Sequence, residues 1–388
     1  MKKTHKIKLI KNLSLVVAIA IFIFSCNVEN KKASISVYID DIGNDTILMT
    51  LISFDQEPSY LFDTIISKNE EIQFDTLINK LHYGYIITKG MYKNLNNNSP
   101  YFIRSKSIEF FLSPNEDLVI NGESKEFKTD YKLEGSNLNE QFNIYRKKTI
   151  DYYAETVELD YIIENHYIDN SPDSIIDSLI KKQRESSIKK AKEEKAFILN
   201  YPNYEYTAFL LNKQRKDTII KYYPLLTVSA KESEYGQLLE KQIIIWESIK
   251  IGAAAPDFEY LTLENDTFKL SDKKGKYVVL DFWGSWCGSC IMGIPKMKEY
   301  YSKYSDRMEF VGIACRDTEK KWTRAVEKYN IPWIQILNIE NKEKNLVNNY
   351  GVEGFPTKII INKQGIIKEI FLGETDEFYT KMDNLLKE

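Results

Sequence analysis

The chain is poor in the side chains that build metal centres and disulfide scaffolds. Its 388 residues include only four cysteines and three histidines. Four cysteines are too few to stabilise a chain of this length by disulfide bonds. With so few histidines, a complete set of zinc ligands is also not expected. Basic residues are not in excess, because 53 lysines and arginines stand against 56 aspartates and glutamates. This balance, without any basic stripe, argues against a nucleic-acid partner.

The amino terminus combines positive charge with a short apolar stretch. Five lysines within the first 11 residues precede the apolar run from Leu13 to Phe24, which is the order found in a secretory signal. The run has 12 residues, whereas a membrane-spanning helix needs about 20. It ends in Ile-Phe-Ser-Cys26, which resembles the lipobox of bacterial lipoproteins except that Phe24 replaces a small residue. We therefore predict a lipoprotein signal peptide over residues 1–26, with lipid attached to Cys26.

The predicted signal peptide also predicts the location of the protein. Acyl chains on Cys26 would anchor it in a bacterial membrane of the cell envelope, facing the periplasm or the cell surface. Two alternatives stay open, an ordinary secreted protein with a spare cysteine and an uncleaved membrane anchor. Both secreted forms would be exported into an oxidising space.

Residues 27–136 are expected to form a β-rich domain. Short apolar runs alternate with turn residues, for example in Thr46–Ile52, Tyr83–Ile87 and Ile108–Leu112. Asn-Gly and Pro-Asn pairs punctuate these runs, as they do between antiparallel strands. The segment contains no recognisable catalytic constellation. We predict an N-terminal antiparallel β domain whose function is open.

The spacing of apolar residues becomes helical over residues 137–250. Ser171-Pro172-Asp173 has the composition of an N-cap and first turn, and apolar residues then recur at helical spacing until Pro202. A second helical pattern covers residues 234–249. The lysines and glutamates between the apolar positions are typical of a solvated helix face. This segment is therefore predicted to be a helical connector or subdomain.

Residues 251–388 alternate strands with helices. The run Val278-Val279-Leu280 is typical of a parallel strand covered on both faces. Strands are predicted at 276–284, 308–315 and 333–337, helices at 291–304 and 318–329, a hairpin at 357–373 that turns at 363–365, and a last helix from Glu374. This order predicts an α/β domain with a sheet of mixed strand direction.

Two cysteines follow the first of these strands. Cys287 is expected at the start of a helix, where unpaired N–H groups and the helix dipole favour a thiolate. Cys290 lies one turn further on the same face, within reach of any mixed disulfide that Cys287 forms. Gly288 and Ser289 let the turn close without bulk, and Trp286 would shield one side while leaving the Cys287 sulfur exposed. The pair is therefore predicted to be a redox couple, with half a zinc site and a static structural disulfide as alternatives.

One acidic residue interrupts the apolar strand. Asp281 stands between Leu280 and Phe282, so we expect burial to raise its pKa. A carboxylate with a raised pKa is suited to exchanging a proton with the thiol of Cys290. The alternative is a carboxylate that only forms hydrogen bonds with the backbone.

These motifs resemble the thioredoxin family. The segment 281–290, Asp-Phe-Trp-Gly-Ser-Trp-Cys-Gly-Ser-Cys, resembles its active site, with Pro295 where that family kinks the following helix. Residues 354–357, Gly-Phe-Pro-Thr, are similar to its cis-proline loop. Ala-Pro-Asp-Phe at 255–258 resembles the TlpA/ResA-like branch, which is related to the AhpC/TSA family. The β-rich segment further resembles a domain of unknown function found ahead of such modules in lipoproteins.

The resemblance implies a role for each matching residue. Cys287 would be the attacking thiol, Cys290 the resolving thiol and Asp281 the buried proton acceptor. Trp286, Phe355 and Pro356 would bind the client, with Pro356 preceded by a cis peptide bond. No metal or other cofactor is implied. Ser289 stands where cytosolic thioredoxin has proline, so its reduction potential does not carry over. Cys315 is an additional cysteine, for which buried packing is predicted and a third redox thiol is the alternative.

The predicted function is that of an exported, lipid-anchored thiol-disulfide oxidoreductase. Its partners would be disulfide-containing client proteins and an upstream membrane electron donor. One alternative is a surface-binding lipoprotein with an accessory redox module. Another is a thiol peroxidase, which is disfavoured because its Pro-x-x-x-Thr/Ser-x-x-Cys motif is absent: Gly284 and Leu280 occupy the two required positions before Cys287.

Overall fold

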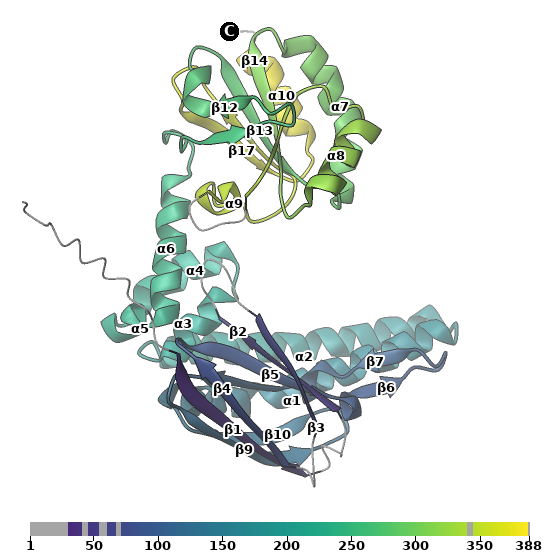
Figure 1. Cartoon of the computed structure of the whole chain (residues 1–388). Coiled ribbons are helices and arrows are strands. Elements are labelled where there is room, and N and C mark those ends of the chain that lie inside the picture. Colours follow the sequence, from purple (N-terminus) through teal and green to yellow (C-terminus); the bar gives the residue numbers. More distant parts are fainter. Residues whose placement is uncertain (1–29, 41–45, 54–59, 67–70, 340–343, 387–388) are drawn as a thin grey trace, which may run out of the picture.

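The computed structural model describes the chain except residues 1–29, 41–45, 54–59, 67–70, 340–343 and 387–388. The predicted signal peptide and Cys26 lie outside the described residues. None of the helices in the described part is both long enough and apolar enough to cross a bilayer. Figure 1 shows two lobes, a lower one that contains nearly the first two thirds of the chain and an upper one that contains its last third.

The lower lobe is built on two four-stranded sheets. The first has the order β10-β9-β1-β4 and the second β3-β2-β5-β8. Inward and outward residues alternate along β1, which buries Ile35, Val37 and Ile39. The strands are β1 (Lys31–Asp40), β2 (Thr46–Ile52), β3 (Tyr60–Ile66), β4 (Glu71–Ile78), β5 (His82–Thr88), β8 (Ile108–Leu112), β9 (Asp117–Ser124) and β10 (Thr129–Glu134), with a separate hairpin of β6 (Tyr92–Asn94) and β7 (Pro100–Phe102).

The predicted antiparallel β domain is confirmed with one difference. Strands β1 and β9 pair in parallel, whereas the other neighbours in both sheets are antiparallel. The chain between β1 and β9 passes through the second sheet before it returns, and such a long connection allows the two strands to run in the same direction.

Six α-helices follow the strands and complete the same core. They are α1 (Asn137–Ile168), α2 (Asp173–Asn200), α3 (Glu205–Asn212), α4 (Lys216–Tyr222), α5 (Val228–Glu232) and α6 (Glu234–Ser248). A single hydrophobic cluster contains Ile35 and Phe111 from the sheets together with Phe142 from α1 and Phe209 from α3. The helical segment therefore packs on the sheets rather than only linking two domains. The boundaries at residues 136 and 250 themselves remain a prediction.

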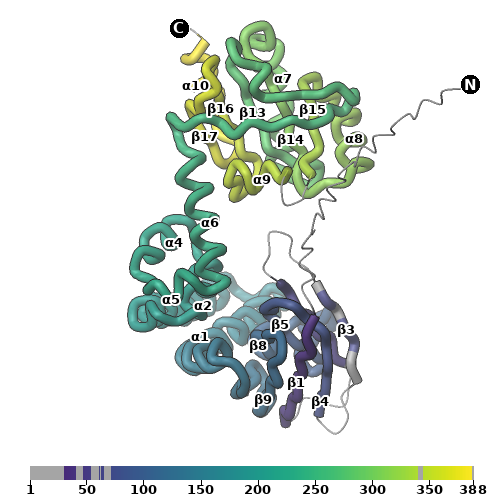
Figure 2. Tube along the Cα trace, turned by 60° about the vertical axis from the view of Figure 1, so that its left-hand side comes forward, coloured from purple at the N-terminus to yellow at the C-terminus, as the bar shows by residue number. Residues whose placement is uncertain are grey.

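Helix α6 leads from the lower lobe into the upper one (Figure 2). Several contacts join the lobes near the end of this helix, among them an ion pair and an aromatic contact. Lys216 Nζ of α4 lies 3.5 Å from the Glu353 carboxylate, and Trp246 of α6 packs beside Gly351. Both upper-lobe residues lie shortly before Phe355 and Pro356 in the chain.

The upper lobe contains a five-stranded sheet with the order β15-β14-β13-β16-β17. Strands β13, β14 and β15 are parallel, while β16 and β17 are antiparallel to their neighbours. The predicted α/β domain with mixed strand direction is thus confirmed. Gly365 adopts a positive φ at the predicted turn between β16 and β17. The strands are β13 (Tyr277–Trp283), β14 (Met308–Ala314), β15 (Ile334–Leu337), β16 (Thr357–Ile361) and β17 (Ile367–Leu372).

Both faces of this sheet are covered. Helices α7 (Gly288–Tyr304), α8 (Glu319–Lys328) and α10 (Asp376–Leu385) contribute to the cluster on one face. The other face is covered by the hairpin of β11 (Glu259–Leu261) and β12 (Thr267–Lys269) and by α9 (Leu346–Asn349). Alternate residues of β13 enter the two clusters, which explains the near-continuous apolar sequence of this strand.

Candidate active site

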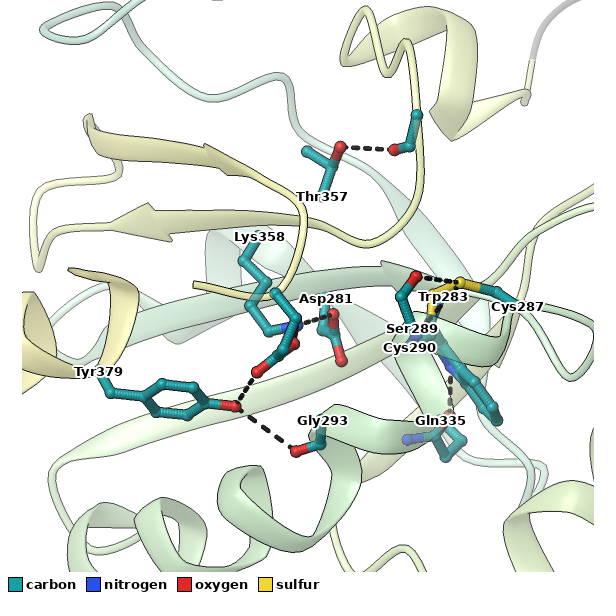
Figure 3. Close-up of polar contacts among 12 residues, drawn as sticks. Asp281, Trp283, Cys287, Ser289, Cys290, Gly293, Gln335, Thr357, Lys358 and Tyr379 are labelled. Carbon is teal, nitrogen blue, oxygen red and sulfur yellow. Dashed lines mark hydrogen bonds and ion pairs between the residues drawn. A yellow bond between two sulfur atoms is a disulfide. The ribbon is translucent and has the colours of Figure 1, made fainter. Parts of the chain in front are cut away.

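The two cysteines lie where β13 gives way to α7 (Figure 3). Cys287 is the N-cap of α7, and its Sγ accepts a hydrogen bond from the Cys290 N–H at 3.2 Å. The Ser289 hydroxyl lies 3.4 Å from the same sulfur. The two sulfurs are joined in a disulfide. Once the disulfide is reduced, the N–H groups and the dipole of α7 favour negative charge on Cys287.

One expectation for Cys287 is wrong. The residue is buried, with 5% of its surface exposed, rather than presenting an open sulfur. The disulfide holds its sulfur against the first turn of α7, where Cys287 packs in one hydrophobic cluster with Cys290, Trp283 and Ile294. An attacking thiol at this position therefore has only a narrow opening to solvent.

The alternative of half a zinc site gains no support from the surroundings of the cysteine pair. Within the part of the chain that the structure describes, no three His, Cys, Asp or Glu side chains converge into a group able to hold a metal ion. The sulfurs of Cys287 and Cys290 are bonded to each other instead.

The loop before Cys287 is held by the residues that follow β14. The Ser285 N–H and hydroxyl donate to the two Asp317 carboxylate oxygens at 2.7 and 2.9 Å. The Trp286 indole N–H donates to the Cys315 carbonyl at 3.0 Å. A Cβ on Gly284 would lie 2.5 Å from the Trp286 Nε1, so glycine is needed for the indole to fold back. Asp317 was not singled out from the sequence, since nothing local to it indicates this contact.

Replacing Asp317 with alanine is expected to loosen this loop. Two charge-assisted hydrogen bonds are lost, so the free energy of unfolding should fall by about 1–2 kcal/mol. Urea unfolding measures this change, and Asp306→Ala, at a side chain that is 75% exposed, is the matched control. Equal stability of the two variants would contradict a role of Asp317 in holding the loop.

The three residues expected to bind a client lie together in the structure. The rings of Trp286 and Phe355 meet edge to face with centroids 5.4 Å apart, and half of Trp286 is exposed. The Phe355–Pro356 peptide bond is cis, as the resemblance implies. The Thr357 hydroxyl donates to the carbonyl of Gly354 at 2.7 Å and closes the loop. Client binding by these residues stays a prediction.

Asp281 lies on the side of the sheet that faces α7, where it has a charged partner. It is directly opposite Lys358 in the β13–β16 pairing, and the Lys358 Nζ lies 3.2 Å from its carboxylate. Their side chains are 13% and 3% exposed. Burial raises the pKa of Asp281, and Lys358 opposes this rise without cancelling it. The alternative in which Asp281 only binds the backbone is wrong, because its partner is an ammonium group.

Sequence analysis did not identify Lys358 or its second partner, Glu374, as residues of the site. The Lys358 Nζ also lies 2.8 Å from the carboxylate of Glu374, which follows β17. A signal for Lys358 existed, because it interrupts the apolar run of β16 as Asp281 interrupts that of β13. No comparable signal marks Glu374, which stands in a polar turn.

Cys315 follows the last residue of β14 and has no exposed surface. Its thiol donates to the carbonyl of Ile313 at 3.2 Å. It belongs to the hydrophobic cluster on one face of the sheet, whereas Cys287 and Cys290 belong to the cluster on the other face. The structure therefore favours buried packing over a third redox thiol.

Comparisons with known proteins agree with this geometry. The model of the AhpC/TSA family matches residues 251–370. The thiol-disulfide oxidoreductase ResA of Bacillus anthracis is 33% identical over 129 residues, which cover 33% of this chain and 73% of that protein. The thioredoxin-like protein YneN of Bacillus subtilis is 32% identical over 128 residues, covering 32% and 73%. The solved thioredoxin domain of a Bacteroides vulgatus thiol-disulfide oxidoreductase is 28% identical, covering 36% of this chain and 99% of its own, with a TM-score of 0.34.

A disulfide-bonded cysteine pair at the start of a helix, next to an α/β sheet of this order, defines a thiol-disulfide oxidoreductase of thioredoxin-like fold. The chain belongs to the ResA-like thiol-disulfide oxidoreductases within the AhpC/TSA-related group. The predicted class of enzyme and its thioredoxin-like part are thereby confirmed. The lower lobe stays outside this assignment, and its likeness to a lipoprotein domain remains a prediction.

Proposed function

We propose that the protein is an exported, membrane-anchored enzyme that reduces or exchanges disulfides in client proteins through Cys287 and Cys290. The observation that carries this proposal is the position of Cys287 as the N-cap of α7, with its sulfur 3.2 Å from the Cys290 N–H. That arrangement stabilises a thiolate on one sulfur and keeps the second sulfur within bonding distance.

The proposed reaction starts from the reduced dithiol. The Cys287 thiolate attacks one sulfur of a client disulfide, so that a mixed disulfide forms and the other client sulfur leaves as a thiolate. Cys290 then gives up its proton and its sulfur attacks Cys287, which forms the Cys287–Cys290 disulfide and releases the second client sulfur. The client gains two electrons, and a membrane electron donor must return two electrons to the enzyme.

The surface around the disulfide suits an extended client segment. The exposed Trp286 ring and the ring of Phe355 form an apolar edge beside the cysteines. Backbone groups next to Pro356 would pair with the client strand, and the aromatic edge would cover its side chains. In this proposal the client brings its sulfur into the narrow opening above Cys287.

The site of action follows from the amino terminus. Lipid on Cys26 would anchor the protein in a membrane of the cell envelope, facing the periplasm or the cell surface. Radiolabelled palmitate tests this directly, since it should label the wild-type chain in cells but leave Cys26→Ala unlabelled. Equal labelling of the two chains would overturn the anchor.

Reduction of insulin tests the proposed activity. With dithiothreitol as the electron donor, the purified full-length protein should accelerate insulin precipitation, and the Cys287→Ser, Cys290→Ser double variant should run at the uncatalysed rate. Cys315→Ser is the matched control, because it removes the buried cysteine and leaves the pair intact. A wild-type protein that is inert while both thiols of the pair are free would overturn the proposal.

A further inference from the structure

One lysine and two carboxylates share a buried site beside α7. The Lys358 ammonium group lies 3.2 Å from Asp281 and 2.8 Å from Glu374. Figure 3 shows Lys358, Asp281 and Tyr379 converging on the side of the sheet that faces α7. The Tyr379 hydroxyl of α10 donates to the Glu374 carboxylate. The three charged groups leave a net charge of about −1 in a site from which water is largely excluded.

Helix α7 is shaped to admit one of these carboxylates. Gly293 lies one turn after Cys290, and a Cβ placed on it would come within 2.4 Å of the Glu374 carboxylate. The Tyr379 hydroxyl lies 3.5 Å from the carbonyl oxygen of Gly293. Glycine at this position thus allows the carboxylate to lie against the helix that carries the cysteine pair.

The two partners of Lys358 act on Asp281 with opposite sign. Burial raises the pKa of Asp281 most strongly, the positive charge of Lys358 lowers it, and the negative charge of Glu374 raises it again. For Lys358, burial alone would lower the pKa, but the two carboxylates reverse this and raise it. The ammonium group therefore stays charged, and the competition between the two carboxylates for it adjusts how readily the buried Asp281 takes up a proton.

Other polar groups near the site form pairs with side chains outside it. Lys296 of α7 lies over the Tyr379 ring at 4.5 Å, but it pairs with Asp376, and these two side chains are 42% and 91% exposed. Tyr300 of α7 also faces Tyr379, with ring centroids 4.7 Å apart, and its hydroxyl donates to Asp383. Lys296 therefore offers a control on the same helix, outside the buried group formed by Lys358, Asp281 and Glu374.

We propose that Lys358 and Glu374 are positioning residues that set, in opposite directions, the readiness of Asp281 to accept the proton of Cys290. The proposal rests on the function proposed above, in which Cys290 must lose its proton to resolve the mixed disulfide. In that step the S–H proton passes to the Asp281 carboxylate, a bond forms between the Cys290 and Cys287 sulfurs, and the bond from Cys287 to the client breaks. The client sulfur leaves with the electron pair as a thiolate.

Two substitutions test this directly in the reduced full-length protein. The pKa of Asp281 is read from the carboxyl carbon by NMR, and the pH at which insulin reduction reaches half its maximal rate is measured in parallel. Lys358→Met removes the positive charge and should move both values up by about 1 unit. Glu374→Gln removes the competing carboxylate and should move both down by a similar amount.

Gly293→Ala supplies a third test that removes no charged group from the protein. Its methyl group displaces the Glu374 carboxylate, so the pKa of Asp281 should move down, as in Glu374→Gln. Lys296→Met is the matched control and should move neither value. Should Lys358→Met not fold, Glu374→Gln and Gly293→Ala still provide the downward shift.

Shifts of equal sign in Lys358→Met and Glu374→Gln, or no shift in Glu374→Gln and Gly293→Ala, would overturn the proposal. A purely structural role would lower the maximal rate without moving the pH at which half of it is reached. A wild-type protein that reduces no disulfide while the Asp281 pKa shifts in opposite directions would overturn the proposed function. The same result would leave the charge arrangement around Asp281 established.

Discussion

Replacing Cys290 with serine is expected to trap client proteins covalently on Cys287. The helix dipole and the N–H of residue 290 still stabilise the Cys287 thiolate, so the first attack on a client disulfide proceeds. The second attack cannot occur, because serine offers no thiolate at neutral pH, and the mixed disulfide accumulates. Non-reducing electrophoresis of the variant purified from its native host should show high-mass adducts that dithiothreitol dissolves.

Two controls make the trapping experiment specific. The Cys287→Ser, Cys290→Ser double variant should form no adducts, because the attacking sulfur is missing. Cys315→Ser should resemble the wild-type chain, since Cys315 is buried on the other face of the sheet. Adducts of equal abundance in Cys290→Ser and the double variant would refute the assignment of Cys287 as the attacking thiol.

The Lys358→Met variant is expected to unfold far more easily than the wild-type protein. Removing one partner of a buried ion pair leaves the other charge without compensation, which costs about 3 kcal/mol. Here the single ammonium group, 3% exposed, serves the carboxylates of Asp281 and Glu374 together. Urea unfolding at pH 7 measures the loss. Lys296→Met, at an exposed pair, should change the stability by less than about 0.5 kcal/mol.

The stability loss should also depend on pH with a defined sign. The pKa of Asp281 is raised in the folded protein, so its contribution to stability is complete below the ordinary Asp value of about 4 and is lost as the pH rises through the folded pKa. Without Lys358 that pKa rises further. The free energy of unfolding of Lys358→Met should therefore fall more steeply than that of the wild-type chain between about pH 4 and pH 8. Parallel curves for the two proteins would rule out the ion pair as the cause.

Local patterns explain which parts of the fold could be predicted. The apolar run of β13, the helix after Cys287 and the hairpin at Gly365 each depend on neighbouring residues, so periodicity and turn chemistry identify them. The parallel pairing of β1 with β9 could not be predicted in this way. The two strands are separated along the chain by strands β2 to β8, and their alternating pattern is the same for either direction.

The features of the site likewise divide into those that depend on neighbouring residues and those that depend on long-range packing. The Cys-Gly-Ser-Cys spacing and the aspartate in an apolar strand indicate thiol chemistry with a buried carboxylate, because both depend only on residues close together in the chain. The burial of Cys287 was not foreseen, since it arises from packing against side chains of β13 and α7.

Residues close together in the chain are enough to indicate the type of chemistry, because a helix that begins at Cys287 and places Cys290 one turn later needs only local backbone geometry. The charges around Asp281, in contrast, depend on long-range contacts. The register of β13 against β16 puts Lys358 opposite it, and the turn after β17 brings Glu374 against Gly293. Such contacts depend on the register of the strands and on where small residues leave space for a neighbouring side chain. Neither property can be predicted from the spacing of residues along the chain.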